Sequence, residues 1–167
     1  LQNLGPQVLA SRMVRDYTLG YYLPAAQASR KAVSDSFAGA HAIATFRSRV
    51  EAAWPSVQVT QVDSAGLPDT PVIGSSLSLR AHVQLGGLTP GDVTVQAVLG
   101  RVSPSDELTE VTTVAMAHVG SDSAGEVFAV DTPVPLSGAV GYTVRVLPRH
   151  ELLAGDAEFG MVVTPRL

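Results

Sequence analysis

Apolar residues recur with a helical period in the first third of the chain. Met13, Tyr17 and Tyr21 are spaced four residues apart, which places them on one face of a helix. Ser11, just before them, is a candidate cap for the helix start. Pro24 lacks an N–H, and its ring presses on the carbonyl four residues earlier, so we expect this helix to end or kink there.

Two further helical segments follow Pro24. The alanine-rich stretch "PAAQASRKAV" favours a resumed helix. After Ser36, an apolar stripe predicts a third helix that stops at Pro55. The stripe consists of Ile43, Phe46, Val50 and Trp54.

The apolar period changes to two after Pro55. Three stretches alternate clearly, "LSLRAHVQL", "DVTVQAVLG" and "GYTVRVL", and turn-forming sequences separate them. Weaker strands are expected at Val57 to Val62, Leu108 to His118, Glu126 to Val130 and Phe159 to Val163. The predicted fold class is α+β: a short N-terminal helical segment, residues 1–54, followed by an antiparallel immunoglobulin-like β-sandwich of about seven strands, residues 55–167.

Tyr142 occupies an inward position of "GYTVRVL". It follows a glycine-rich corner, where a buried tyrosine typically ties its hydroxyl to nearby backbone. We therefore expect Tyr142 to pack in the core and not to serve as an exposed sugar-stacking platform.

Composition narrows the choice of partners. The 167 residues are 46% hydrophobic and 16% charged, which is typical of a globular chain. A net charge of −4 argues against a nucleic-acid partner, and no basic cluster or long apolar run indicates a membrane. The absence of cysteine excludes disulfides and thiolate sites and fits a cytoplasmic protein. A chain that opens on Leu1 is expected to be a piece of a longer protein or a processed one.

The sequence assigns no catalytic, cofactor-binding or metal-binding residue. The histidines, His41, His82, His118 and His150, fall on separate elements without metal-ligand spacing, so we expect surface or half-buried imidazoles. No G-x-S-x-G elbow or phosphate-binding loop is present. The aspartates fall mostly in turns, and two glutamates open strands, so nothing local indicates a glycosidase pair. These carboxylates are Asp63, Asp69, Asp92, Asp106, Asp122, Asp156, Glu126 and Glu158.

Four segments in order resemble the C-terminal part of actinobacterial-type α-glucan (glycogen or maltodextrin) phosphorylases. The closing helix of that group carries M-x-R-D-Y and then Y-x-P-A-A. The matching residues are Met13, Arg15, Asp16, Tyr17, Tyr22, Pro24, Ala25 and Ala26. The resemblance continues through "AAWPSVQV", "LTPGDVTVQAVLGRV" and "GYTVRVLPRHELL", and so spans nearly the whole chain.

The resemblance implies a parent enzyme that is a retaining glycosyltransferase. Such enzymes use inorganic phosphate to release glucose 1-phosphate from α-1,4-glucan. Their pyridoxal phosphate is held on a lysine and acts through its own phosphate group, between two catalytic lobes. Those lobes are missing here, and Lys31 lies in "ASRKAV", outside the family's glycine-rich cofactor segment. We therefore expect no cofactor in this chain and pyridoxal phosphate in the parent enzyme.

The resemblance also suggests a partner for the tyrosine-rich helix. In phosphorylases the closing helix crosses back over the other lobe, so Tyr17 and Tyr21 are expected to face the missing catalytic lobes of the parent enzyme. The alternative is that these tyrosines pack on the sandwich itself. For the chain as a whole we expect a structural or assembly role. A glucan-binding module, an unrelated protein-interaction sandwich and a homo-oligomer stay open.

Overall fold

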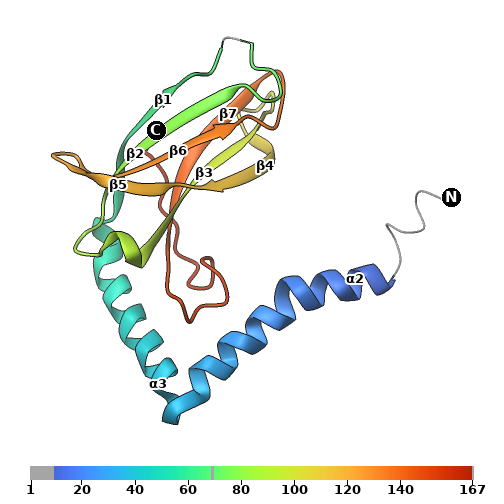
Figure 1. The fold of residues 1–167 in the computed structure, drawn as a ribbon. Helices are drawn as coiled ribbons and strands as arrows, with labels where there is room; N and C mark the ends of the chain where they lie inside the picture. Colours follow the sequence, from blue (N-terminus) through green and yellow to red (C-terminus); the bar gives the residue numbers. More distant parts are fainter. Residues whose placement is uncertain (1–9, 69, 167) are drawn as a thin grey trace.

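The computed structural model describes residues 10–68 and 70–166. Helix α2 (Ala10–Tyr17) runs through a π-helical turn at Thr18–Tyr22 into α3 (Leu23–Ala53) (Figure 1). Pro24 directly follows the π-helical turn, where the regular four-residue hydrogen bonding is already interrupted. The N–H of Leu23 reaches back five residues to the carbonyl of Thr18. The helix therefore does not end at Pro24, because one widened turn accommodates the proline.

The real break in the helix lies at Ser34–Phe37, which we call the elbow. Asp35, Ser36 and Phe37 all have left-handed backbone angles, with φ of 49°, 56° and 66°. For residues with a side chain this conformation costs roughly 1–2 kcal/mol each. The elbow divides the helix into residues 10–33, called the arm, and residues 38–53, called the second limb. The third helix expected after Ser36 is this second limb.

The strands form a two-layer sandwich in which every named pair is antiparallel. One sheet has the order β1-β2-β6-β5 and the other the order β4-β3-β7. Their bounds are β1 Gln58–Ala65, β2 Ser76–Gln84, β3 Val93–Val102, β4 Leu108–Ala115, β5 Ala117–Asp122, β6 Gly125–Pro133 and β7 Val140–Pro148. The four-stranded sheet thus has the ABED order of immunoglobulin-type sandwiches, with β4 as an added C′ strand. The predicted fold class is confirmed.

Two of the expected strands differ from the structure. The single strand expected at Leu108 to His118 is two strands, because the chain changes sheets at Met116, which is buried and donates its N–H to the carbonyl of Val95. The strand expected at Phe159 to Val163 is reduced to an isolated bridge between Val163 and Val146 of β7. This bridge lies where the last strand of an immunoglobulin-type sandwich would pair.

The core lies between the sheets and extends into the second limb. Apart from the half-buried Tyr142, the inward residues of β2, β3 and β7 are buried, as the alternation predicts; they are Leu77, Leu79, Ala81, Val83, Val93, Val95, Ala97, Leu99, Val144 and Val146. Phe46 and Val50 join them from the helix. Gly86 makes this contact possible, since a Cβ there would lie 2.7 Å from the carbonyl oxygen of Ala53. No helix within residues 10–68 and 70–166 has the length and apolar character needed to cross a bilayer.

Tyr142 connects the two sheets. Its ring is half-buried against the core, as expected. Its hydroxyl donates to Ser64 Oγ at 2.6 Å, from β7 to β1 on the opposite sheet. The expected bond to nearby backbone is therefore wrong, because a side chain far away in sequence accepts instead.

We predict that Tyr142→Ala lowers the free energy of unfolding by about 3 kcal/mol, since it removes a large packed ring. Tyr142→Phe should lower it by only about 1 kcal/mol, the contribution of one hydrogen bond. Urea unfolding of both variants measures the two losses. An alanine variant as stable as the parent would show that the ring contributes nothing to packing.

Candidate functional site

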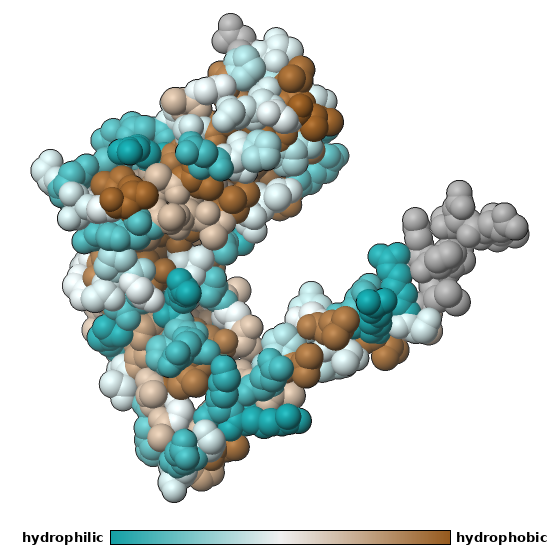
Figure 2. All heavy atoms as spheres, in the orientation of Figure 1, coloured by the Kyte–Doolittle hydropathy of each residue, from teal (hydrophilic) through white to brown (hydrophobic). Residues whose placement is uncertain are grey.

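The arm carries an apolar surface that the rest of the chain does not cover. Tyr17, Tyr21 and Tyr22 are 49%, 67% and 68% exposed, and the rings of Tyr17 and Tyr21 contact each other with centroids 5.8 Å apart. Other large apolar side chains on this helix are exposed as well: Met13, Val14, Leu19, Leu23 and Val33. Figure 2 shows the arm projecting away from the sandwich with open space between them. The alternative that these tyrosines pack on the sandwich is therefore wrong.

Such an arm is unusual for an isolated domain. Helices that are apolar on several faces are normally buried, and monomers seldom expose large contiguous apolar patches. The arm is about 36 Å long from its 24 residues at 1.5 Å each. Its surface is therefore the strongest candidate for an interaction site.

The inner side of the arm forms a second feature, which we call the inner groove. It is an open groove of about 780 Å³ between the arm, the second limb and the loop that contains Leu152–Glu158. The arm contributes Gly20, Pro24, Ala28 and Ala32, spaced four residues apart. The lining is mainly apolar.

The sandwich lacks the feature that would favour sugar binding. A glucan platform would need exposed aromatic rings on one sheet face. Among the described residues, the aromatic side chains from Phe46 onward are all buried or half-buried; they are Phe46, Trp54, Phe128, Tyr142 and Phe159. The exposed rings are those of the helical part.

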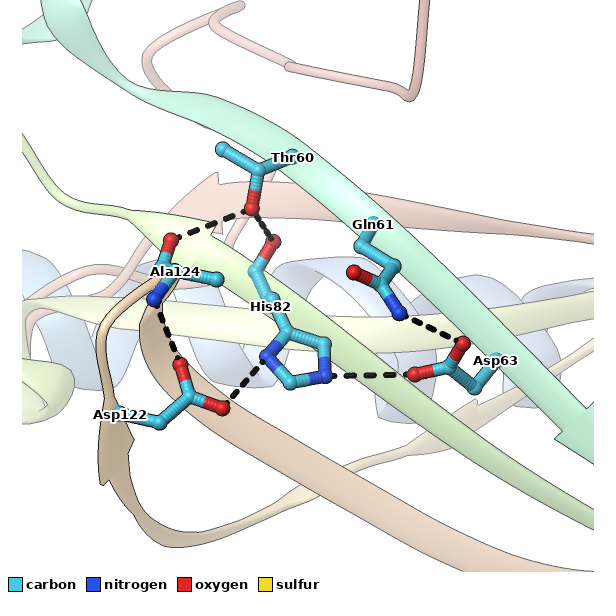
Figure 3. Close-up of polar contacts among 6 residues, drawn as sticks. All are labelled: Thr60, Gln61, Asp63, His82, Asp122 and Ala124. Atoms are coloured by element: carbon cyan, nitrogen blue, oxygen red, sulfur yellow. Dashed lines mark hydrogen bonds and ion pairs between the residues drawn. The ribbon is translucent and has the colours of Figure 1, made fainter.

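His82 is held between two aspartates on the outer face of the four-stranded sheet (Figure 3). Its Nε2 lies 3.3 Å from Asp63 of β1, and its Nδ1 lies 3.1 Å from Asp122 at the end of β5. Nδ1 makes no hydrogen bond, and each of the two contacts is an ion pair only when the ring is protonated. The His82 side chain is 12% exposed. The ring therefore links the β1 edge strand to the β5–β6 turn.

The surroundings of Asp122 favour its charged form. The backbone N–H of Ala124 donates to Asp122 at 2.8 Å and holds the pKa of this carboxyl below its ordinary value. Desolvation opposes this shift, and His82 adds to it. The neighbouring hydroxyl, Thr60 Oγ1, hydrogen-bonds to the backbone carbonyls of His82 and Ala124 and not to the imidazole, so the arrangement fits a structural role better than catalysis.

The remaining histidines and carboxylates do not converge. His118 pairs with Glu126 at 2.6 Å, His150 stacks on Phe46, and His41 is exposed. In the described part of the chain, no three histidine or acidic side chains are arranged to hold a metal ion.

The carboxylates depart from expectation at three positions. Asp63 lies inside β1, Asp122 is the last residue of β5, and Glu158 lies in a loop and does not open a strand. Asp69 lies outside the described residues. Sequence reasoning missed the His82 contacts, because only the strand register brings Asp63 and Asp122 beside this ring.

The residues present do not fit a pyridoxal phosphate site. Lys31 is the chain's one lysine, and it is exposed on the arm close to the elbow. No glycine-rich phosphate-binding loop opens the helix on which it lies.

Comparison with known proteins gives one family and several close relatives. The family described as "Glycogen phosphorylase C-terminal domain" matches residues 54–166. Proteins named "Glycogen phosphorylase" from two strains of Mycobacterium tuberculosis and from Mycobacterium bovis are 56% identical to the chain over 163 residues. The match covers 97% of this chain but 19% of each relative. No solved structure matches significantly.

We predict that Asp122→Asn destabilises the sandwich at neutral pH and that the difference disappears in acid. A carboxyl whose folded pKa lies below its unfolded value of 3.8 stabilises the fold above that value. This stabilisation is lost as the pH falls through the folded pKa. Melting temperatures of wild type and Asp122→Asn between pH 7 and pH 2.5 measure it.

Asp106→Asn is the matched control, because Asp106 lies in an exposed turn with a left-handed backbone that asparagine tolerates. It should leave the melting temperature nearly unchanged at neutral pH. A wild-type advantage over Asp122→Asn that persists undiminished at pH 2.5 would show that the charge of Asp122 is not its source.

Proposed function

Because the chain belongs to the glycogen phosphorylase C-terminal domain family, which matches residues 54–166, we propose that it is the non-catalytic accessory end of an α-glucan phosphorylase. Its task is structural: the sandwich anchors the arm, and the arm docks on the catalytic region of the same polypeptide. The single observation that carries this proposal is the exposed apolar arm.

The length of the relatives supports the identity of the docking partner. The chain spans 19% of each relative that it matches, so about four fifths of such a polypeptide lies outside the matched part. The matched family is a C-terminal domain, so that remainder precedes it. Among the described residues, the arm is the part nearest in sequence to that preceding region. An apolar helix at this junction can remove its apolar surface from water by packing on the region that it joins, which is favourable.

The parent's chemistry follows from the relatives' printed name. We infer phosphorolysis of an α-1,4-glucan to glucose 1-phosphate, with pyridoxal phosphate as the cofactor of the catalytic region and a cytoplasmic location. This chain supplies no lysine in a cofactor cradle, since Lys31 is exposed. Its contribution to the reaction is therefore indirect, through assembly of the enzyme.

We predict that the isolated chain has no phosphorylase activity and forms no specific adduct with pyridoxal phosphate. Incubation with the cofactor, phosphate and maltodextrin should yield no glucose 1-phosphate, and any adduct that borohydride traps on Lys31 should be no greater than that on the unfolded chain, because Lys31 is an exposed amine. The intact parent enzyme is the positive control. Product formation by the isolated chain, or trapping on Lys31 that requires the folded chain, would refute the accessory role.

We predict that Tyr17→Ser combined with Tyr21→Ser weakens docking of the arm in the intact parent enzyme by about 3 kcal/mol, from the lost burial of two rings. Thermal inactivation of phosphorolysis should occur at a lower temperature. Val119→Ser is the matched control, because Val119 is a similarly exposed apolar residue on β5.

In the isolated chain, both variants should leave melting of the sandwich unchanged, since all three side chains are exposed there. Inactivation of the double variant at the wild-type temperature would contradict docking through these tyrosines.

A further inference from the structure

We propose that the inner groove receives an apolar helix from the catalytic region of the same polypeptide, so that the arm and the sandwich loop hold that region from two sides. This inference rests on the proposed accessory role and adds a specific binding site for the partner. It assigns a binding function to the loop at Leu152–Glu158, which the docking of the arm alone would not require.

The shape of the groove favours a helix. One wall is the row Gly20, Pro24, Ala28 and Ala32, and the opposite wall is the loop with Leu152, Ala154 and Ala157. Small side chains along a row at intervals of four residues form a shallow channel between helical ridges. A second helix can approach such a channel closely, at interaxial distances of about 8–10 Å.

The chemistry of the groove favours an apolar protein surface over a sugar or a phosphate. Glu158 is the one charged residue in its lining, and its carboxylate accepts a hydrogen bond from the backbone N–H of Ala154 at 2.8 Å. No arginine, lysine or histidine lines the groove. A phosphate would therefore find no countercharge, and a glucan would find few side-chain hydrogen-bond partners.

The elbow fixes the groove in place. Gly39 lies so close to the arm that a Cβ would be 2.5 Å from the carbonyl oxygen of Lys31, and Ser34 Oγ donates to the same oxygen at 2.9 Å. The two limbs therefore meet at a contact that needs glycine at this position. Phe37, in a left-handed conformation, is 57% exposed and so gains little packing within this chain. Unfavourable backbone angles of this kind persist where surrounding contacts stabilise them. A partner packed against both limbs would supply such contacts.

The groove is continuous with the apolar surface of the arm. Tyr21 belongs to both, because it lines the groove and its ring contacts that of Tyr17. One partner can therefore cover the tyrosines and fill the groove. The four fifths of the relatives that precede the matched part are the nearest source of such a partner.

Hydrogen exchange of the intact parent enzyme and of the isolated chain tests this inference. We expect exchange at least tenfold slower in the intact enzyme for residues 20–32 and also for residues 152–158. The turn at residues 103–107 is the internal control, because it lies outside the groove lining and should exchange equally in both proteins.

A pair of substitutions gives a second measurement. Ala28→Phe fills the groove, whereas Ala44→Phe places the same ring on an exposed position of the second limb that does not line it. Both should leave melting of the isolated chain unchanged. In the intact enzyme, Ala28→Phe should lower the inactivation temperature and Ala44→Phe should not.

Each outcome decides between the two proposals. Slow exchange in residues 20–32 with an unchanged loop would overturn the groove inference and leave docking of the arm intact. Equal exchange of both segments in the two proteins would overturn both. The isolated chain could also show slow exchange in both segments that becomes slower as the protein concentration rises, together with a doubled mass. That result would show that a second copy of the chain occupies the groove and would overturn the inference. An equal effect of the two phenylalanine variants would also contradict it.

Discussion

The arrangement of the whole chain depends on the joint between the second limb and the sandwich. Phe46 and Val50 are 3% and 0% exposed within the core, and burial of such side chains contributes roughly 1.5–3 kcal/mol each. Arg49 forms two hydrogen bonds with Asp92, at 2.6 and 3.1 Å, from the same turns of helix. Burial of Asp92 raises its pKa, but hydrogen bonds from Thr89 and the charge of Arg49 outweigh burial and lower it. Apolar packing and a two-point ion pair together fix the direction of the second limb, and the elbow then fixes the direction of the arm.

The apolar residues of the two limbs therefore lie in opposite environments, buried in the second limb and exposed to solvent on the arm. The second limb has one apolar stripe, and the sandwich covers its residues Phe46 and Val50. The arm has apolar residues on several faces, and the described residues of the chain leave them exposed. Most of the stability of a helix in a protein comes from packing of its apolar residues, and the described residues supply little of it to the arm. The sandwich is consequently the part of the chain that can hold its own structure, and the arm is the part that gains most from a partner.

The sequence predicted what depends on local periodicity and missed what depends on distant contacts. Alternation on β2, β3 and β7 identified the buried face, and the stripe through Phe46 and Val50 identified the packed side of the second limb. The elbow was not predictable, because Asp35, Ser36 and Phe37 are not residues that typically adopt left-handed angles in succession. The site at His82 was missed for a similar reason, since its carboxylates come from different strands. The resemblance to phosphorylases led to the expectation that Tyr17 and Tyr21 face away from the sandwich, and both are exposed; the partner that it implied for them belongs to the proposal.

The fixed elbow explains why an accessory sandwich would help an arm to dock. A free helix that binds a partner loses conformational freedom, and this loss opposes association. Anchoring by Phe46, Val50 and the Arg49–Asp92 pair removes much of that freedom before binding, because the second limb is already held. Gly39 lets the arm leave the elbow at a defined angle, and the loop at Leu152–Glu158 adds a second wall to the surface presented. The sandwich would therefore strengthen docking mainly by preorganising the arm.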